Sequence, residues 1–186
     1  MLKYNPDPQK GPEKLAHLKS SEYVSCGHMD EDKFNSYFKF AFVRNPWSRI
    51  VSEYRYRNYH KKMSFKDFIL HGLPTESNYS DDYRHITPQY DFLHDETGKL
   101  LVDFVGRFER LQEDFDLISS QLGIIHSQLP HINASKQKSS LIGKLMFLKE
   151  RSKNYHYTDY YNEETERLVR NMYKKDIQAF QYNFGE

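Results

Sequence analysis

Apolar positions recur along the chain with two different periods, which predict strands in some segments and helices in others. Residues 37–43 form an aromatic and β-branched run that stops before the turn-prone Asn45-Pro46, a pattern typical of a buried strand. After Pro46, the apolar residues at positions 47, 50, 51 and 54 share one face of a helix. The sequence therefore predicts that a strand feeds a helix through Arg44-Asn45-Pro46.

The same periodicities predict further elements. Turn formers and polar residues at 73–89 indicate a long surface loop. Apolar runs and capping residues predict a short helix at 64–71, a strand at 100–105, a helix at 108–122 and a last helix at 162–180. Strands that alternate with helices indicate an α/β fold with a parallel sheet flanked by helices.

Length and composition indicate a single folded domain. The chain has 186 residues, enough for one core, and 16% of them are aromatic. Pro6, Pro8 and Pro12 disfavour regular structure near the N-terminus. We therefore expect a poorly anchored lead-in over residues 1–21 and one domain over residues 22–186.

Charge and cysteine content exclude several classes of protein. A formal charge of +1 is too low for a dedicated nucleic-acid binder, so any anion site must be local. The single cysteine, Cys26, excludes an intramolecular disulfide and a multi-cysteine zinc site. No apolar run approaches the roughly 18 residues that cross a bilayer, and the N-terminus has no apolar signal-peptide core, so no membrane partner is expected.

Candidate anion-binding residues lie at the junction of the predicted strand and helix. Arg44 follows the strand, where a guanidinium can bind an anion at the carboxyl edge of a sheet. Ser52 lies about two turns into the helix, and Arg49 lies about one turn before Ser52. The alternative is that Arg44 and Arg49 pair with carboxylates while Ser52 only packs.

The segment FKFAFVRNPWSRIVSEY, residues 38–54, resembles the 3′-phosphate-binding motif of sulfotransferases, in the carbohydrate-directed branch often called family 2. The resemblance implies that Arg44 and Ser52 hold the 3′-phosphate of 3′-phosphoadenosine 5′-phosphosulfate (PAPS), the co-substrate. It implies a P-loop-NTPase-like sulfotransferase fold with a parallel sheet. Weaker similarity covers residues 25–184 through the segments 88–93, 102–109, 129–133 and 160–165.

One part of the family pattern is not found. Relatives carry a strand followed by a loop of the form P-K-x-x-G-(S/T)-(S/T), which holds the 5′-phosphosulfate at a helix N-terminus. The nearest string, residues 7–12, has no Ser or Thr after its glycine and places Pro12 where an N–H donor is needed. We therefore expect a sulfotransferase fold without its first strand and its 5′-phosphosulfate loop, either because this unit lies outside the given chain or because the protein has lost it.

The resemblance also suggests other site residues. His28, just before the Arg44 strand, is the first candidate for a catalytic base, and His85 is the second, although a surface histidine is the more common case for either. The positions expected near the adenosine or a phosphate are Arg107, Phe108, Lys136 and Lys153, with solvated charge as the alternative for the lysines. The nine histidines include no pair spaced four apart, so no metal is expected.

The function that the resemblance implies is transfer of a sulfuryl group from PAPS to a hydroxyl of a carbohydrate-type acceptor. The alternative is a non-catalytic module that binds adenosine 3′,5′-bisphosphate or an anionic glycan. The absence of a targeting signal favours a cytoplasmic protein like bacterial relatives, whereas an N-terminal anchor outside this chain would indicate the Golgi lumen.

Overall fold

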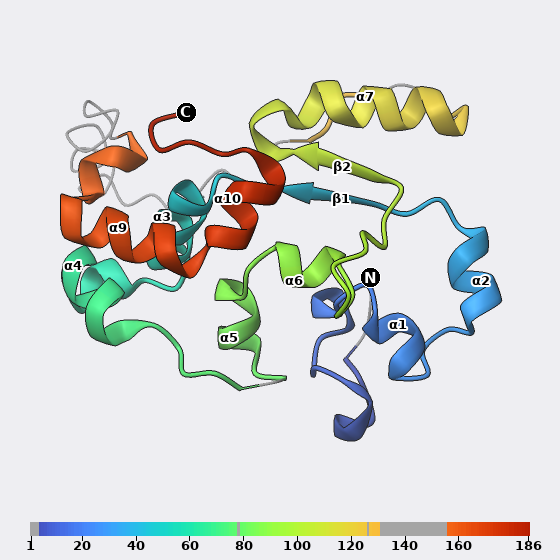
Figure 1. Cartoon of the computed structure of the whole chain (residues 1–186), viewed down its shortest axis with the longest axis horizontal. Coiled ribbons are helices and arrows are strands. Elements are labelled where there is room, and N and C mark those ends of the chain that lie inside the picture. The colour runs from blue at the N-terminus through green and yellow to red at the C-terminus, as the bar shows by residue number, and fades with distance from the viewer. Residues whose placement is uncertain (1–3, 78, 126, 131–155) are drawn as a thin grey trace, which may run out of the picture.

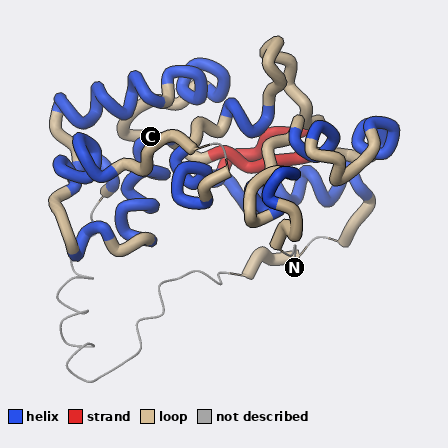
Figure 2. Tube along the Cα trace, turned by 90° about the horizontal axis from the view of Figure 1, so that it is seen from below, coloured by secondary structure: helices blue, strands red, loops and turns tan. Residues whose placement is uncertain are grey.

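A computed structural model describes residues 4–77, 79–125, 127–130 and 156–186. The described part is an α/β structure in which the first strand, β1 (Phe40–Val43), runs parallel to the second, β2 (Phe104–Arg107). Phe40 lies opposite Phe104 and Val43 opposite Arg107, so both strands point toward the same edge (Figure 1). Figure 2 shows the strand pair between helical segments. The predicted fold class, a parallel sheet flanked by helices, is confirmed.

Both strands differ in detail from the sequence-based prediction. β1 is less buried than predicted, because 43% of Phe40 is exposed and only Val43 is buried. This exposure follows from the strand's position, since β1 has a strand on only one edge among the described residues. The strand predicted at 100–105 lies at 104–107 instead, because Leu100 forms an isolated bridge with His94 before the chain reaches the sheet.

The helix after β1 is α3 (Pro46–Tyr56), and it has the local signals expected of it. The Asn45 side chain accepts hydrogen bonds from the N–H groups of Trp47 and Ser48, and Pro46 occupies the first turn. Trp47, Ile50, Val51 and Tyr54 are buried on one face. This face forms the centre of the core, where the other buried members are Val43, Phe65, Phe68, Ile69, Ile86, Leu93, Val169, Tyr173 and Tyr182.

The other helices lie around this core or, in the case of α1 and α2, to one side of it (Figure 1). They are α1 (Glu22–Ser25), α2 (Glu31–Ser36), α4 (Phe65–Asp67), which continues as a π-helix (Phe68–Gly72), α5 (Asp81–Ile86), α6 (Tyr90–Leu93), α7 (Leu111–Leu122), α9 (Glu163–Met172) and α10 (Lys174–Phe180). Short 3-10 helices span Pro8–Lys10, Leu15–His17, Tyr59–Lys61, Phe108–Arg110 and Tyr157–Tyr160.

Three of these helices, α5, α9 and α10, correct the sequence-based prediction at two places in the chain. The segment 73–89, predicted as a loop, contains α5, which Ser80 caps by accepting from the N–H of Tyr83. The helix predicted at 162–180 is two helices, α9 and α10, which meet at Tyr173. The side chain of Tyr173 is fully buried and its hydroxyl donates to the carbonyl of Ile86, so a tertiary contact fixes the junction.

The N-terminal lead-in is held more firmly than its composition predicts. Lys14 forms an ion pair with Asp81 at 2.8 Å, and Leu18 is buried. The backbone of Tyr4 bridges to that of Lys14. In the part of the chain that the structure describes, no helix is both long and apolar enough to span a bilayer.

Candidate functional site

The turn between β1 and α3 is fixed by side chains from distant parts of the chain. The N–H of Arg44 donates to Gln89 Oε1, and Gln89 Nε2 donates to the carbonyl of Arg44, both at 2.8 Å. The N–H of Asn45 donates to Glu109 Oε1 at 2.8 Å. Gln89 and Glu109 therefore hold the backbone of this turn from two sides.

A second layer holds those two side chains in turn. The hydroxyl of Tyr182 lies 3.0 Å from Glu109 Oε2 and 3.1 Å from the carbonyl of Val43. The carboxylate of Asp176 is buried and accepts from the N–H groups of Gln89 and Tyr90 at 2.9 and 2.8 Å. Burial raises the pKa of Asp176 although these hydrogen bonds oppose the shift. Segments 88–93 and 102–109, which carry the family resemblance, thus converge on the Arg44 turn.

The guanidinium of Arg44 is oriented by neutral groups. Its Nε and Nη2 donate to Ser48 Oγ at 3.1 and 2.9 Å, and its plane lies 4.5 Å from the centre of the Phe108 ring. Burial lowers the pKa of Arg44, while the charge of Glu109 acts in the opposite direction. Among the described residues no group accepts from its Nη1, so this partly desolvated guanidinium keeps a donor that is suited to bind an anion.

Arg49 is also held by neutral groups. Its Nη1 and Nη2 donate to the carbonyls of Thr87 and His85, each at 2.8 Å. Within the described ranges, no carboxylate lies within ion-pair distance of Arg44 or Arg49. The alternative that these arginines pair with carboxylates therefore finds no support in this part of the chain.

Arg44, Arg49 and Ser52 line one cavity of about 870 Å³. One wall of the cavity is the whole of residues 37–44, the strand β1 with its flanks. Polar side chains from other elements also reach the cavity: His17, Ser20, Glu53, Arg84, His85 and Gln89. The cavity thus extends along β1, and Arg44, Arg49 and Ser52 lie near the carboxyl end of the strand, where ligands commonly bind in α/β folds.

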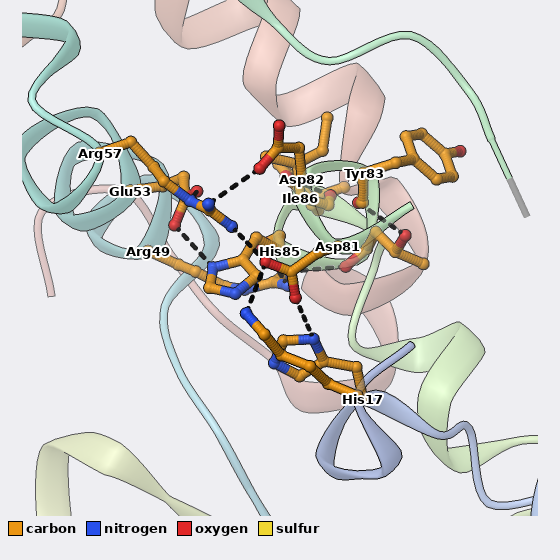
Figure 3. Close-up of polar contacts among 12 residues, drawn as sticks. His17, Arg49, Glu53, Arg57, Asp81, Asp82, Tyr83, His85 and Ile86 are labelled. Carbon is orange, nitrogen blue, oxygen red and sulfur yellow. Dashed lines mark hydrogen bonds and ion pairs between the residues drawn. The ribbon is translucent and has the colours of Figure 1, made fainter. Parts of the chain in front are cut away.

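His85 is positioned in this cavity by a carboxylate. Its Nδ1 lies 3.0 Å from Glu53 Oε2 (Figure 3). Its ring stacks on that of Tyr56 with centres 6.1 Å apart. Burial acts to raise the pKa of Glu53, but the hydrogen bonds from His85 and Arg57 outweigh it, so the pKa lies below its usual range. An ionised carboxylate favours the tautomer with the proton on Nδ1, in which Nε2 of a neutral imidazole is the acceptor.

A second histidine and carboxylate lie beside this pair. His17 Nδ1 is 2.8 Å from Asp81 Oδ1, and the rings of His17 and His85 meet edge to face with centres 4.9 Å apart (Figure 3). Burial lowers the pKa of His17 more than Asp81 raises it. Neither this group nor Glu53 was identified from the sequence, because no local spacing links residue 17 to residues 81 and 85.

The other predicted site residues are scattered. His28 does not line the cavity, and its Nε2 lies 2.6 Å from the carbonyl of Lys10. Arg107 lies over the ring of Tyr182 and donates to the carbonyl of Phe180. Phe108 contacts Arg44 as described above. Lys136 and Lys153 lie outside the described residues.

Comparison with known proteins gives one family. An uncharacterized protein from Archaeoglobus fulgidus is 36% identical over 95 residues, which cover 49% of this chain and 72% of that protein. No solved structure matches the chain. A model of the sulfotransferase family matches residues 3–183, which include the Arg44 turn and the side chains that hold it. The chain therefore belongs to the sulfotransferase family.

Proposed function

We propose that this protein transfers a sulfuryl group from PAPS to a hydroxyl group, with a carbohydrate as the class of acceptor that its resemblance favours. The observation that carries the proposal is the pair of arginines, Arg44 and Arg49, that line a cavity beside Ser52 without a carboxylate partner among the described residues. Their charges are available to an anionic ligand, and family membership gives that ligand a class.

The residues present suit the 3′-phosphate of the nucleotide. Arg44 is partly desolvated, which strengthens its hydrogen bonds to a phosphate. The Gln89 and Glu109 contacts fix the Arg44 backbone, so little conformational freedom remains to be lost when a ligand binds. Ser52 adds a hydroxyl that lines the same cavity, and the Phe108 ring packs against the Arg44 guanidinium.

His85 is the residue we propose as the general base. Its Nε2 is the acceptor nitrogen because Glu53 binds Nδ1, and both side chains line the cavity that holds Arg44 and Ser52. In the reaction, the acceptor oxygen bonds to sulfur as the bond from sulfur to the 5′-phosphate oxygen breaks, and the hydroxyl proton passes to His85. Of the two histidines considered from the sequence, His85 is preferred over His28 because only His85 faces this cavity.

Transfer of a labelled sulfuryl group from PAPS to a panel of mono- and oligosaccharides tests the proposal. We expect labelled product with the unmodified chain, a large loss with His85→Gln, and little change with His71→Gln, since His71 is exposed and lies outside the cavity. General-base catalysis contributes about 10²–10⁴-fold, which sets the expected loss. Equal rates for the two variants would contradict the role of His85.

The second candidate function is binding of adenosine 3′,5′-bisphosphate without transfer. The geometry of residues 7–12 favours it, because Pro8–Lys10 is a 3-10 helix whose terminal carbonyl contacts His28, and no phosphate-binding loop is formed there. Tight nucleotide binding with no transfer to any acceptor would support this candidate.

A further inference from the structure

The cluster of His17, Asp81 and His85 has the composition of a transition-metal site. One ligand atom of each residue lies within 4.8 Å of the others. In tetrahedral zinc sites the ligand atoms are about 3.3 Å apart, so small side-chain rotations would close the set around an ion. Two imidazoles and one carboxylate are a common ligand set for Zn²⁺ and related divalent ions.

Two buried atoms of His17 and Asp81 that face each other make no hydrogen bond. His17 Nδ1 and Asp81 Oδ1 are both inaccessible to solvent, and neither makes an aligned hydrogen bond although they are 2.8 Å apart. If His17 is neutral and protonated at Nε2, two lone pairs face each other there. A cation between the two atoms removes this repulsion.

The surrounding contacts match those that orient metal ligands in proteins. Glu53 binds Nδ1 of His85 at 3.0 Å and leaves Nε2 for an ion. In metal sites, the N–H of the histidine nitrogen that does not bind the metal commonly donates a hydrogen bond to a carboxylate in this way. Lys14 and Arg57 bind the second oxygen of Asp81, Oδ2, at 2.8 and 3.0 Å, and leave Oδ1.

The ion-pair network around the cluster contains carboxylates and fixed cations. Arg57 also pairs with Glu53 and with Asp82, at 3.1 and 2.8 Å. Lys14 and Arg57 therefore face three carboxylates, from Glu53, Asp81 and Asp82. The guanidinium of Arg49, which binds the carbonyl of His85 at 2.8 Å, adds a third cation nearby, so fixed cations and carboxylates around the cluster balance.

We propose that His17, Asp81 and His85 bind a divalent first-row transition metal, with Zn²⁺ the best match to the ligand set. His17 and His85 line the cavity described above, so the remaining coordination positions of the ion would face that cavity. The site does not require the nucleotide, and it would place an ion on the acceptor nitrogen of His85. Bound metal would therefore inhibit any reaction that uses His85 as a base.

Titration of the tag-free chain with ZnCl₂, followed by calorimetry, tests the site. We expect one equivalent of Zn²⁺, and we expect Co²⁺ in its place to give the visible absorption of a tetrahedral complex. His17→Gln and Asp81→Asn each remove a metal ligand and should weaken Zn²⁺ binding by at least about tenfold. Glu53→Gln should weaken it by about 10–100-fold, as expected for a residue that orients a metal-binding side chain. His71→Gln and Cys26→Ser are controls that should bind as the unmodified chain does.

Absence of stoichiometric binding would overturn the proposal, as would binding that survives His17→Gln or that is lost in Cys26→Ser. If the variants do not fold, the unmodified chain still decides the matter. Zn²⁺ should then shift the imidazole NMR signals of two histidines, and unshifted imidazole signals would refute the site. None of these readouts involves nucleotide or sulfuryl transfer, so a failure here is distinct from a failure of the proposed function.

Discussion

Gln89→Ala perturbs the backbone of the Arg44 turn without touching the arginine itself. The substitution removes the acceptor of the Arg44 N–H and the donor to the Arg44 carbonyl, two hydrogen bonds of 2.8 Å each. A hydrogen bond contributes about 0.5–1.5 kcal/mol net, so the free energy of unfolding should fall by about 1–3 kcal/mol. For a chain of this length that corresponds to a fall in Tm of about 2–4 °C per kcal/mol.

Urea denaturation measures the stability change and calorimetric titration with adenosine 3′,5′-bisphosphate measures the effect on the site. Because Arg44 loses its positioning but keeps its charge, the affinity of Gln89→Ala should lie between those of the unmodified chain and Arg44→Ala. Gln121→Ala, an exposed position near the end of α7, is the matched control. A Gln89→Ala variant with unchanged unfolding free energy and unchanged affinity would refute the idea that Gln89 fixes this turn.

Three further predictions concern the packing behind the site. Tyr182→Phe removes the hydroxyl that contacts Glu109 and Val43, so we expect the free energy of unfolding, measured by urea denaturation, to fall by about 1 kcal/mol. Tyr4→Phe, at an exposed ring, should leave that free energy unchanged. Gly106→Ala would place a Cβ 2.6 Å from the Phe42 ring, so we expect the free energy of unfolding, measured by thermal denaturation, to fall by about 1–3 kcal/mol. Gly123→Ala is not a usable control, because a φ of +66° strains any residue other than glycine. Trp47→Ala removes the largest fully buried side chain, so we expect the free energy of unfolding to fall by about 3–5 kcal/mol. The loss should appear as a reduced folded yield and altered near-UV circular dichroism. A Trp47→Ala chain as stable as the original would contradict its place in the core.

Local signals were sufficient to predict the elements on either side of the Arg44 turn. Asn45 and Pro46 define the start of α3 on their own, because a capping side chain and a proline in the first turn are independent of tertiary context. The position of Arg44 at the end of β1 follows from the apolar run before it. The sequence therefore predicted the local structure of the Arg44 turn correctly.

Tertiary contacts decided what the sequence could not predict. The periodicity of residues 162–180 is continuous, but the buried hydroxyl of Tyr173 and the carboxylate of Asp176 bind backbone groups near residues 86–90, and the helix divides at Tyr173. Polar composition concealed α5 within the segment predicted as a loop. The pairing of Glu53 with His85, and of His17 with Asp81, depends on separations of 32 and 64 residues, which no local pattern reveals.

The affinity of the unmodified chain for adenosine 3′,5′-bisphosphate, compared with adenosine 5′-monophosphate, tests the central claim most directly. The two nucleotides differ by the 3′-phosphate that we place on Arg44 and Ser52. A charge-assisted hydrogen bond contributes about 1.5–3 kcal/mol, so the bisphosphate should bind at least about tenfold more tightly than the monophosphate. Arg44→Ala should abolish this difference in affinity. Arg170→Ala, which changes an exposed ion pair, should preserve it. Equal affinities for the two nucleotides, or a preference that persists in Arg44→Ala, would contradict the account.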